Sequence, residues 1–232
     1  MQATCASNPC TTNECCVDDV VVVKEITTTG GAENSIATLN NNAGSGVLNE
    51  QELQKQYDQR KEILKYLNGN TTASVNKKTE LLEKVTTSTT TLDVGGAELA
   101  LDVSHGIIYD IMNTTTEKRQ NITQKVGGVV SNVVLALDHF SQSGANGGFT
   151  NDAYTRAVRS VDNTISRLSD AQLVGIQVNG DAVALRTFSF QLVSQRVTNV
   201  GQKSSRRVLN VGNVHFNSST STTISIPPYL GA

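Results

Sequence analysis

The chain has 232 residues, a formal net charge of -2 and a sequence pI near 5.9. This balance does not fit a nucleic-acid-binding surface, which normally carries a basic stripe. No window approaches the roughly 18–20 consecutive apolar residues that a membrane helix needs, so no spanning segment is expected. Apolar residues make up only 38% because Thr, Asn and Ser contribute 68 of the 232 residues. With no Trp and 4% aromatic residues, the composition argues against a stacking platform or a large apolar pocket.

All cysteines lie within the first sixteen residues, as Cys5, Cys10, Cys15 and Cys16. Zinc sites usually combine closely spaced cysteine pairs with nearby histidines, whereas the nearest histidine here is His105. We therefore favour disulfides over a metal site and expect no cofactor. Adjacent cysteines rarely bond each other, so Cys15 and Cys16 each pair with Cys5 or Cys10, which leaves two connectivities. A disulfide knot indicates an oxidising, extracellular compartment.

The segment 1–46 is predicted as a Cys-rich head, a strand and a linker. No apolar signal segment precedes the cysteines, so we expect either numbering after processing or a piece of a longer protein. The β-branched run 17–26 predicts a strand, and the Asn/Gly/Ser-rich stretch 40–46 predicts the linker. The strand either folds back on the chain's own β unit or completes a neighbour's sheet. Its candidate assembly residues are Val20, Val21, Val22, Val23 and Ile26.

The segment 47–171 is predicted to be helical. Asn49 and Glu52 form a capping-box-like start, and apolar residues then recur at spacings of three and four. Gly127-Gly128 would cost roughly 1–2 kcal/mol in helix propensity, which is acceptable if another backbone packs closely there. Short polar connections favour an antiparallel bundle of about five helices. Their expected ranges are 49–68, 74–86, 96–112, 117–141 and 151–170.

At about residue 172 the apolar period changes from 3.6 to 2, which predicts an antiparallel, sandwich-like β unit over 172–232. Asn179-Gly180 is typical of a type I′ hairpin turn with positive φ. The basic group at 204–207 is expected in a loop, at a solvated hairpin tip or against a phosphate or sulfated glycan. Helices followed by strands predict the α+β class. The expected strands cover 173–178, 182–185, 187–193, 207–216 and 222–226.

Four N-x-S/T acceptor sequences occur in the chain. They are either glycosylated or chance products of a chain rich in Asn, Ser and Thr, and we favour glycosylation of at least two. The Thr/Ser tract at 86–91 is either O-glycosylated or a polar loop between helices. The four acceptor asparagines are Asn70, Asn113, Asn121 and Asn217.

The stretches 60–67, 81–86, 98–108 and 129–137 resemble the helical half of GAIN domains. These domains occur in adhesion-type G-protein-coupled receptors and in polycystin and egg-jelly-receptor-like proteins. The resemblance covers about residues 49–232 and implies a β-sandwich half after the helices. The family's self-cleavage site is a Cys/Trp-framed segment ending in His-Leu before Ser or Thr. This chain has no Trp, no Cys after Cys16 and no His-Leu pair, so self-cleavage is not carried over.

No catalytic constellation is evident. His105 and His139 fall on separate predicted helices and His215 on a strand, and we interpret each as an ordinary polar or partly buried side chain. Asp18-Asp19 could hold a cation, although such a pair is more often the solvated end of a strand. Walker, HExxH and EF-hand motifs are absent from the sequence. We therefore expect no enzymatic activity.

We interpret the chain as a glycosylated extracellular module of a cell-surface assembly, such as a filament or appendage subunit. Its partners would be copies of itself or other surface proteins. The alternative is a GAIN-like adhesion or mechanosensing ectodomain of a larger membrane receptor. A carbohydrate-active hydrolase is disfavoured, because such enzymes need paired carboxylates and aromatic sugar platforms.

Overall fold

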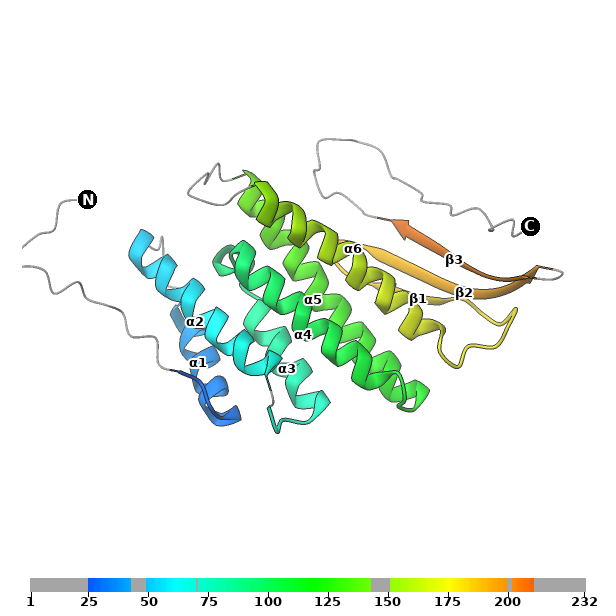
Figure 1. Cartoon of the computed structure of the whole chain (residues 1–232), viewed down its shortest axis with the longest axis horizontal. Coiled ribbons are helices and arrows are strands. Elements are labelled where there is room, and N and C mark those ends of the chain that lie inside the picture. Colours follow the sequence, from blue (N-terminus) through cyan, green and yellow to red (C-terminus); the bar gives the residue numbers. More distant parts are fainter. Residues whose placement is uncertain (1–24, 43–48, 70, 143–150, 200–201, 211–232) are drawn as a thin grey trace, which may run out of the picture.

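The computed structural model describes residues 25–42, 49–69, 71–142, 151–199 and 202–210. These residues form an α+β structure in which a stack of helices carries a small antiparallel sheet at one end (Figure 1). The helices are α1 (Thr29–Asn42), α2 (Glu50–Asn68), α3 (Val75–Thr86), α4 (Val94–Ile111), α5 (Thr116–Gln142) and α6 (Asn151–Leu173), with a 3₁₀ turn, η1 (Thr89–Thr91), before α4. The strands are β1 (Val183–Arg186), β2 (Gln191–Asn199) and β3 (Gln202–Asn210).

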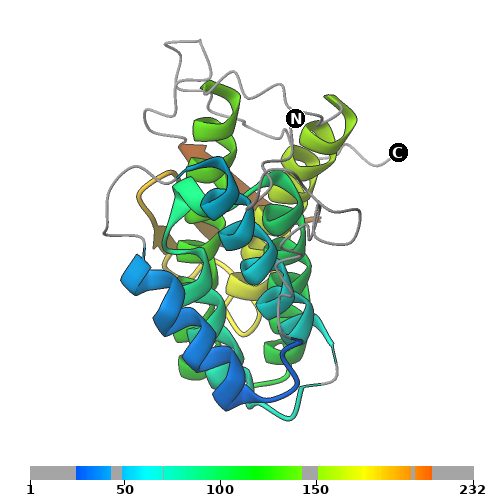
Figure 2. The same ribbon diagram turned by 90° about the vertical axis from the view of Figure 1, so that its left-hand side faces the viewer.

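The elements follow one another in layers along the longest axis of the molecule (Figure 1). Helix α1 packs against α2 and α3, and α3 packs against α5. Strand β1 lies against α5 and strand β2 against α6. Figure 2, viewed from the α1 end, places α1 in front and the strands behind the helices. The first helix and the sheet therefore lie at opposite ends of the described structure.

The five predicted helices are confirmed as α2 to α6, each within three residues of its expected ends. The capping box at the start of α2 is also confirmed. The Asn49 side chain accepts a hydrogen bond from the backbone N–H of Glu52 at 2.9 Å, and the Glu52 carboxylate accepts one from the N–H of Asn49 at 3.2 Å. These bonds satisfy two of the N–H groups that a helix start leaves without partners.

Helix α1 corrects the prediction for residues 29–42. The sequence predicted a linker over 40–46 and no helix before residue 47. Ala32, Ile36 and Leu39, however, recur with helical spacing and are all buried. Because their common face packs against α2 and α3, tertiary contact outweighs the weak local helix propensity.

The predicted strand 17–26 lies outside the described residues except for its last two. Glu25 and Ile26 belong to no strand in the structure. The Ile26 side chain is half-buried and packs against the hydrophobic core beside α1. The described part of the chain is thus anchored at its start by the end of this β-branched run.

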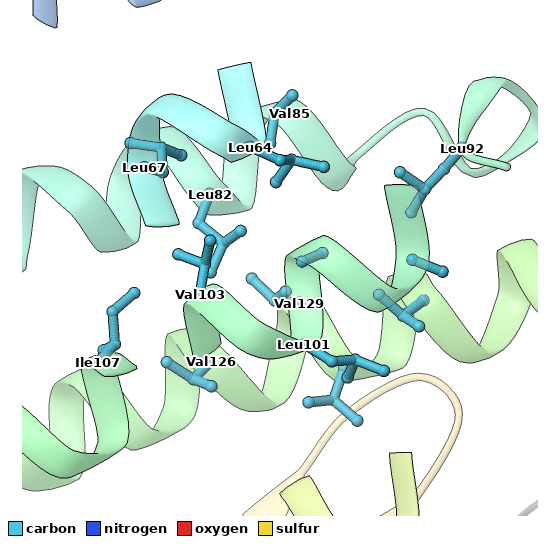
Figure 3. Close-up of a cluster of buried hydrophobic side chains, with 14 of the residues drawn as sticks. Leu64, Leu67, Leu82, Val85, Leu92, Leu101, Val103, Ile107, Val126 and Val129 are labelled. Atoms are coloured by element: carbon cyan, nitrogen blue, oxygen red, sulfur yellow. The ribbon is translucent and has the colours of Figure 1, made fainter. Parts of the chain in front are cut away.

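Helices α2 to α5 bury one continuous apolar cluster, in which side chains from all four helices point toward one another (Figure 3). Each fully buried aliphatic side chain contributes about 1.5–3 kcal/mol, so the cluster can hold the stack together without large aromatic residues. The labelled members are Leu64, Leu67, Leu82, Val85, Leu92, Leu101, Val103, Ile107, Val126 and Val129.

Two basic side chains connect α2 to neighbouring helices. The Asp93 carboxylate caps α4 by accepting a hydrogen bond from the Gly96 N–H at 2.8 Å, and it lies 2.6 Å from the Lys61 ammonium on α2. Arg60 is buried and donates a hydrogen bond to the Val85 carbonyl at the end of α3. Burial lowers the pKa of Arg60 to about 10, so the guanidinium stays charged at neutral pH and faces the negative end of the α3 dipole.

The first predicted hairpin is wrong. Helix α6 continues to Leu173, and residues 174–180 form turns without a strand. The apolar face of α6 extends through Leu168, Ala171 and Leu173, all buried, which explains the longer helix. Asn179 does adopt a positive φ of 60°, so the turn signal is correct although the pairing is not.

Strand β1 pairs instead with β2, and β2 pairs with β3, in the order β1-β2-β3. The predicted strand 187–193 begins only at Gln191, because Thr187 and Phe190 close a tight turn through an N–H to carbonyl bond of 2.9 Å. The strand predicted over 207–216 lies at Gln202–Asn210 in the structure, and 222–226 lies outside the described residues.

Gly127 on α5 lies where the sheet approaches the helices. A Cβ atom added to Gly127 would lie 2.8 Å from Cδ2 of the buried Leu185 on β1, whereas one added to Gly128 would have no neighbour within 4 Å. The close neighbour is therefore a side chain and not the backbone that the sequence suggested.

We predict that Gly127→Ala lowers the free energy of unfolding by about 1–3 kcal/mol, because the packed Leu185 side chain must shift. The matched control Gly128→Ala should raise it by up to about 1 kcal/mol, through helix propensity alone. Urea denaturation monitored by circular dichroism measures both changes. Equal stability of the two variants would contradict this account.

Candidate functional site

The sheet presents one face to the helices. Leu185 on β1 and Leu192 on β2 are directly paired, and both are buried. The next pair in the register, Ala184 and Val193, takes the opposite face because side chains alternate along a strand. Ala184 is exposed and Val193 half-buried. The described helices therefore cover only one face of the sheet.

Buried hydrogen bonds fix the position of the turn between β1 and β2. The Ser189 N–H donates to the Ser131 hydroxyl on α5 at 2.9 Å, and the Ser189 hydroxyl is 3.1 Å from the Ser131 carbonyl. On β2, the Ser194 hydroxyl donates to the Gln172 side chain of α6 at 2.9 Å. Leaving such buried groups unpaired costs about 1–3 kcal/mol each, so these bonds oppose any slip of the sheet.

Strand β3 forms an open edge. Its nine residues pair with β2 from Gln191↔Asn210 to Asn199↔Gln202, and no other described strand pairs with it. Strand β1 has only four residues, and the carbonyl of its last residue, Arg186, accepts a hydrogen bond from Gln124. Open strand edges present rows of N–H and C=O groups to a further strand. The outer edge of β3 is thus the longest strand-pairing surface in the described structure.

The strands of the sheet contain basic residues and no acidic residue. After Asp181 the sequence contains no acidic residue, while five basic residues follow. The group at 204–207 was expected in a loop, but it lies within β3, where Arg206 is paired with Gln195 and Arg207 with Ser194. This asymmetry was visible in the sequence. The five basic residues are Arg186, Arg196, Lys203, Arg206 and Arg207.

Arg119 holds the connections that lead into α5 and out of α6. This buried guanidinium donates to the carbonyls of Met112 at 3.1 Å and Thr114 at 2.7 Å, after α4, and of Val174 at 3.1 Å, after α6. A cation is favoured at these positions because carbonyl groups converge at helix C-terminal ends. The path from α6 to the sheet therefore depends on Arg119, which no sequence motif indicated.

Two of the four predicted acceptor asparagines are described, and both are exposed. Asn113 follows α4, and Asn121 lies on the second turn of α5. Asn70 and Asn217 lie outside the described residues. The polar tract 86–91 contains the end of α3 and η1; Thr86 and Thr91 are buried, whereas Thr87 and Thr90 are exposed.

Asn121 borders a shallow pocket of about 350 Å³ between α3 and α5. Its rim carries two carboxylates and two ammonium groups, which balance one another. Such a rim selects neither an anionic nor a cationic ligand by net charge. The lining residues are Asn76, Thr79, Glu80, Thr115, Glu117, Lys118, Asn121, Ile122 and Lys125.

The predicted histidines are not brought together. The His105 ring on α4 is half-buried, with Nε2 2.7 Å from the Thr164 hydroxyl on α6. Burial, and then the nearby Arg167 charge, lower the pKa of His105, against an opposing effect of Asp102. His139 is exposed on α5, and His215 lies outside the described residues.

Among the described residues, no three His, Cys, Asp or Glu side chains are grouped as metal ligands. No helix there combines the length and the apolar character needed to cross a membrane. Cys5, Cys10, Cys15 and Cys16, the pair Asp18-Asp19 and the predicted assembly residues Val20 to Val23 lie outside the described residues.

Comparisons with models of known protein families, with curated proteins and with solved structures found no match for this chain. The resemblance to GAIN domains therefore stays a hypothesis based on element order and helix pattern.

We predict that Arg119→Met lowers the free energy of unfolding by about 2–4 kcal/mol, because it leaves several carbonyls without their charged donor. Lys118→Met, at an exposed neighbouring position, should change it by less than about 0.5 kcal/mol. Thermal and urea unfolding measure the difference. A small effect at Arg119 would show that the connections after α4 and α6 are held by other contacts.

Acidification should destabilise the protein through His105. Because the folded-state pKa of His105 is lowered, the unfolded chain binds the proton more readily, and stability falls as the pH drops below about 6.5. His105→Gln should remove this part of the pH dependence, while His139→Gln at an exposed position should leave it unchanged. Unfolding free energies measured between about pH 7.5 and 5 test this. Identical pH profiles for both variants would refute it.

Proposed function

We propose that the protein is a non-enzymatic, glycosylated extracellular module of a cell-surface assembly such as a filament or appendage. The observation that supports this best is the open edge of β3, nine residues long and unpaired by any other described strand. Such an edge can take part in strand addition, in which main-chain hydrogen bonds provide affinity between chains.

The seating of the sheet supports a structural role for this edge. Buried hydrogen bonds donated by Ser189 to Ser131 and by Ser194 to Gln172 hold the sheet on α5 and α6. Preorganised elements bind more strongly, because less freedom is lost on association. The outer strand of a sheet that is seated on α5 and α6 is therefore suited to repeated joining of subunits.

The exposed glycan acceptor sequences support the proposal of an extracellular environment. Asn113 and Asn121 are exposed in acceptor sequences, so attached glycans would cause no burial conflict at either asparagine. The predicted disulfides of the Cys-rich head belong to the same proposal. The predicted partners are copies of the chain or other surface proteins, and no enzymatic activity is proposed.

A second candidate function is that of a GAIN-like adhesion or mechanosensing ectodomain within a larger membrane receptor. The order of several helices followed by an antiparallel sheet favours it. In that case the β unit would continue into a sandwich beyond β3. A membrane-spanning segment downstream in the full-length gene would favour this candidate over the first.

The extracellular proposal predicts N-linked glycans at Asn113 and Asn121. Protein secreted from a eukaryotic host should lose mass in discrete steps in Asn113→Gln and Asn121→Gln, as measured by intact-mass spectrometry before and after enzymatic deglycosylation. Asn163→Gln, at an exposed asparagine outside any acceptor sequence, serves as the matched control. Unmodified asparagines in protein isolated from its native source would count against the proposed compartment.

A further inference from the structure

Building on the proposed function, we propose that the outer edge of β3 in one copy receives the β-branched run Val17 to Val23 of a second copy, so that copies join head to tail. The open edge is the acceptor, and the run that precedes Ile26 is the donor. Placement, length and charge each support this assignment over closure within a single chain.

The donor and the acceptor start from opposite ends of the molecule. Ile26 is held against the core beside α1, and α1 lies at the far end of the stack from β3 (Figures 1 and 2). Three packing steps separate α1 from β1, namely α1 to α3, α3 to α5 and α5 to β1, and each covers about 8–10 Å between the axes of the two elements. A further step of about 10 Å leads across the sheet from β1 to β3.

The connecting chain is too short for closure within one copy. If Val17 to Val23 lay along β3, Lys24 alone would have to bridge the distance to residue 25. One extended residue covers at most about 3.6 Å. Even the whole stretch 17–24 reaches no more than about 29 Å, which is less than the packing steps from α1 to β3 added together. The short connection is sufficient when β3 belongs to a second copy, because that copy can approach the α1 end of the first freely.

The charges of the two segments are complementary. Strand β3 contains Lys203, Arg206 and Arg207 and no acidic residue. The donor run includes Asp18 and Asp19. Complementary charges across an interface speed association and disfavour wrong partners.

The chain's own C-terminal stretch 211–232 competes less well for this edge. It contains no acidic residue, and its predicted strand 222–226 spans five positions before Pro227. The donor run offers seven residues to the nine of β3. The part of β2 left unpaired on its β1 side, from Gln195 to Asn199, is also shorter than β3.

Joining through two different surfaces has a consequence for assembly. A contact between unlike patches forms a ring if the rotation closes and an open filament if it does not. Here the donor run precedes Ile26, which is packed at the end of the stack opposite β3, and this favours an extended filament. The pairing of the donor run with the β3 edge of the next copy, here called the joint, would therefore be the contact that links the subunits of the proposed surface assembly.

The first test uses proline in the donor run of the full chain. Val21→Pro and Val22→Pro each remove an N–H, and because alternate N–H groups of a strand face the same neighbour, one of the two must remove a bond to β3. Sedimentation velocity and electron microscopy should show oligomers for the unaltered chain. At least one proline variant should need about tenfold more protein to assemble, whereas Ala3→Pro, outside the run, should assemble normally.

The second test exchanges the charges. Asp18→Lys with Asp19→Lys, or Lys203→Glu with Arg206→Glu, should each weaken assembly, and the chain carrying all four changes should recover it. Circular dichroism checks that the helical core is intact in each variant. Weakened assembly in both pairs without recovery in the fourfold variant would overturn the proposed contact.

Other outcomes separate this inference from the proposed function. Proline variants that assemble like the unaltered chain would overturn the joint alone. If the unaltered chain is monomeric and assembles only after Ile224→Pro, the stretch 222–226 occupies the β3 edge in place of the donor run. If the unaltered chain is monomeric and binds dextran sulfate, the basic strands form a surface for anionic glycans. Either result would overturn the joint. Proline-sensitive assembly of a protein without glycans would support the joint while rejecting the extracellular function.

Discussion

The contact between Leu185 of β1 and the bare backbone at Gly127 of α5 determines where the sheet lies. With no Cβ at Gly127, the Leu185 side chain can approach the helix to a distance that alanine would block. This contact buries Leu185 completely and brings Ser189 within hydrogen-bond distance of Ser131. Once β1 is seated in this way, the antiparallel order places β3 outermost, with its far edge unpaired by any other described strand.

The same layered packing separates the two ends of the molecule. Helix α1 contributes a narrow apolar face to the core through Ala32, Ile36 and Leu39, and it covers the stack at the end opposite the sheet. The Lys77 and Glu33 side chains form an ion pair that joins α3 to α1. Because Ile26 is packed beside this helix, the residues before it start far from β3. The fold thus has two unlike ends, which is the geometry that head-to-tail association requires.

The abundance of Thr and Ser is compatible with a helical core because buried hydroxyl groups bond locally. Thr79, Thr86, Ser104 and Thr164 each donate to the carbonyl four residues earlier, at 2.7–2.9 Å. Such bonds satisfy the hydroxyl without a partner from another element. The core can then be filled mainly by aliphatic side chains, with Phe190 the one buried aromatic residue among those described, which explains how a chain with 4% aromatic residues still builds a continuous apolar cluster.

Local patterns in the sequence determined helices α2 to α6, the Asn49 capping box and the positive φ of Asn179, because each depends on residues a few positions apart. Only the tertiary structure decided that residues 29–42 form a helix, that β1 pairs with β2, and that Arg119, Ser131 and Ser189 hold the sheet in place. The site predictions followed the same division: the exposure of Asn113 and Asn121 and the contact of His105 with Thr164 became known only from the structure. The reason is physical. Periodicity and capping are short-range properties of the chain, whereas strand partners, buried hydrogen bonds and open edges depend on segments far apart in the sequence, such as Ser131 and Ser189, which are 58 residues apart.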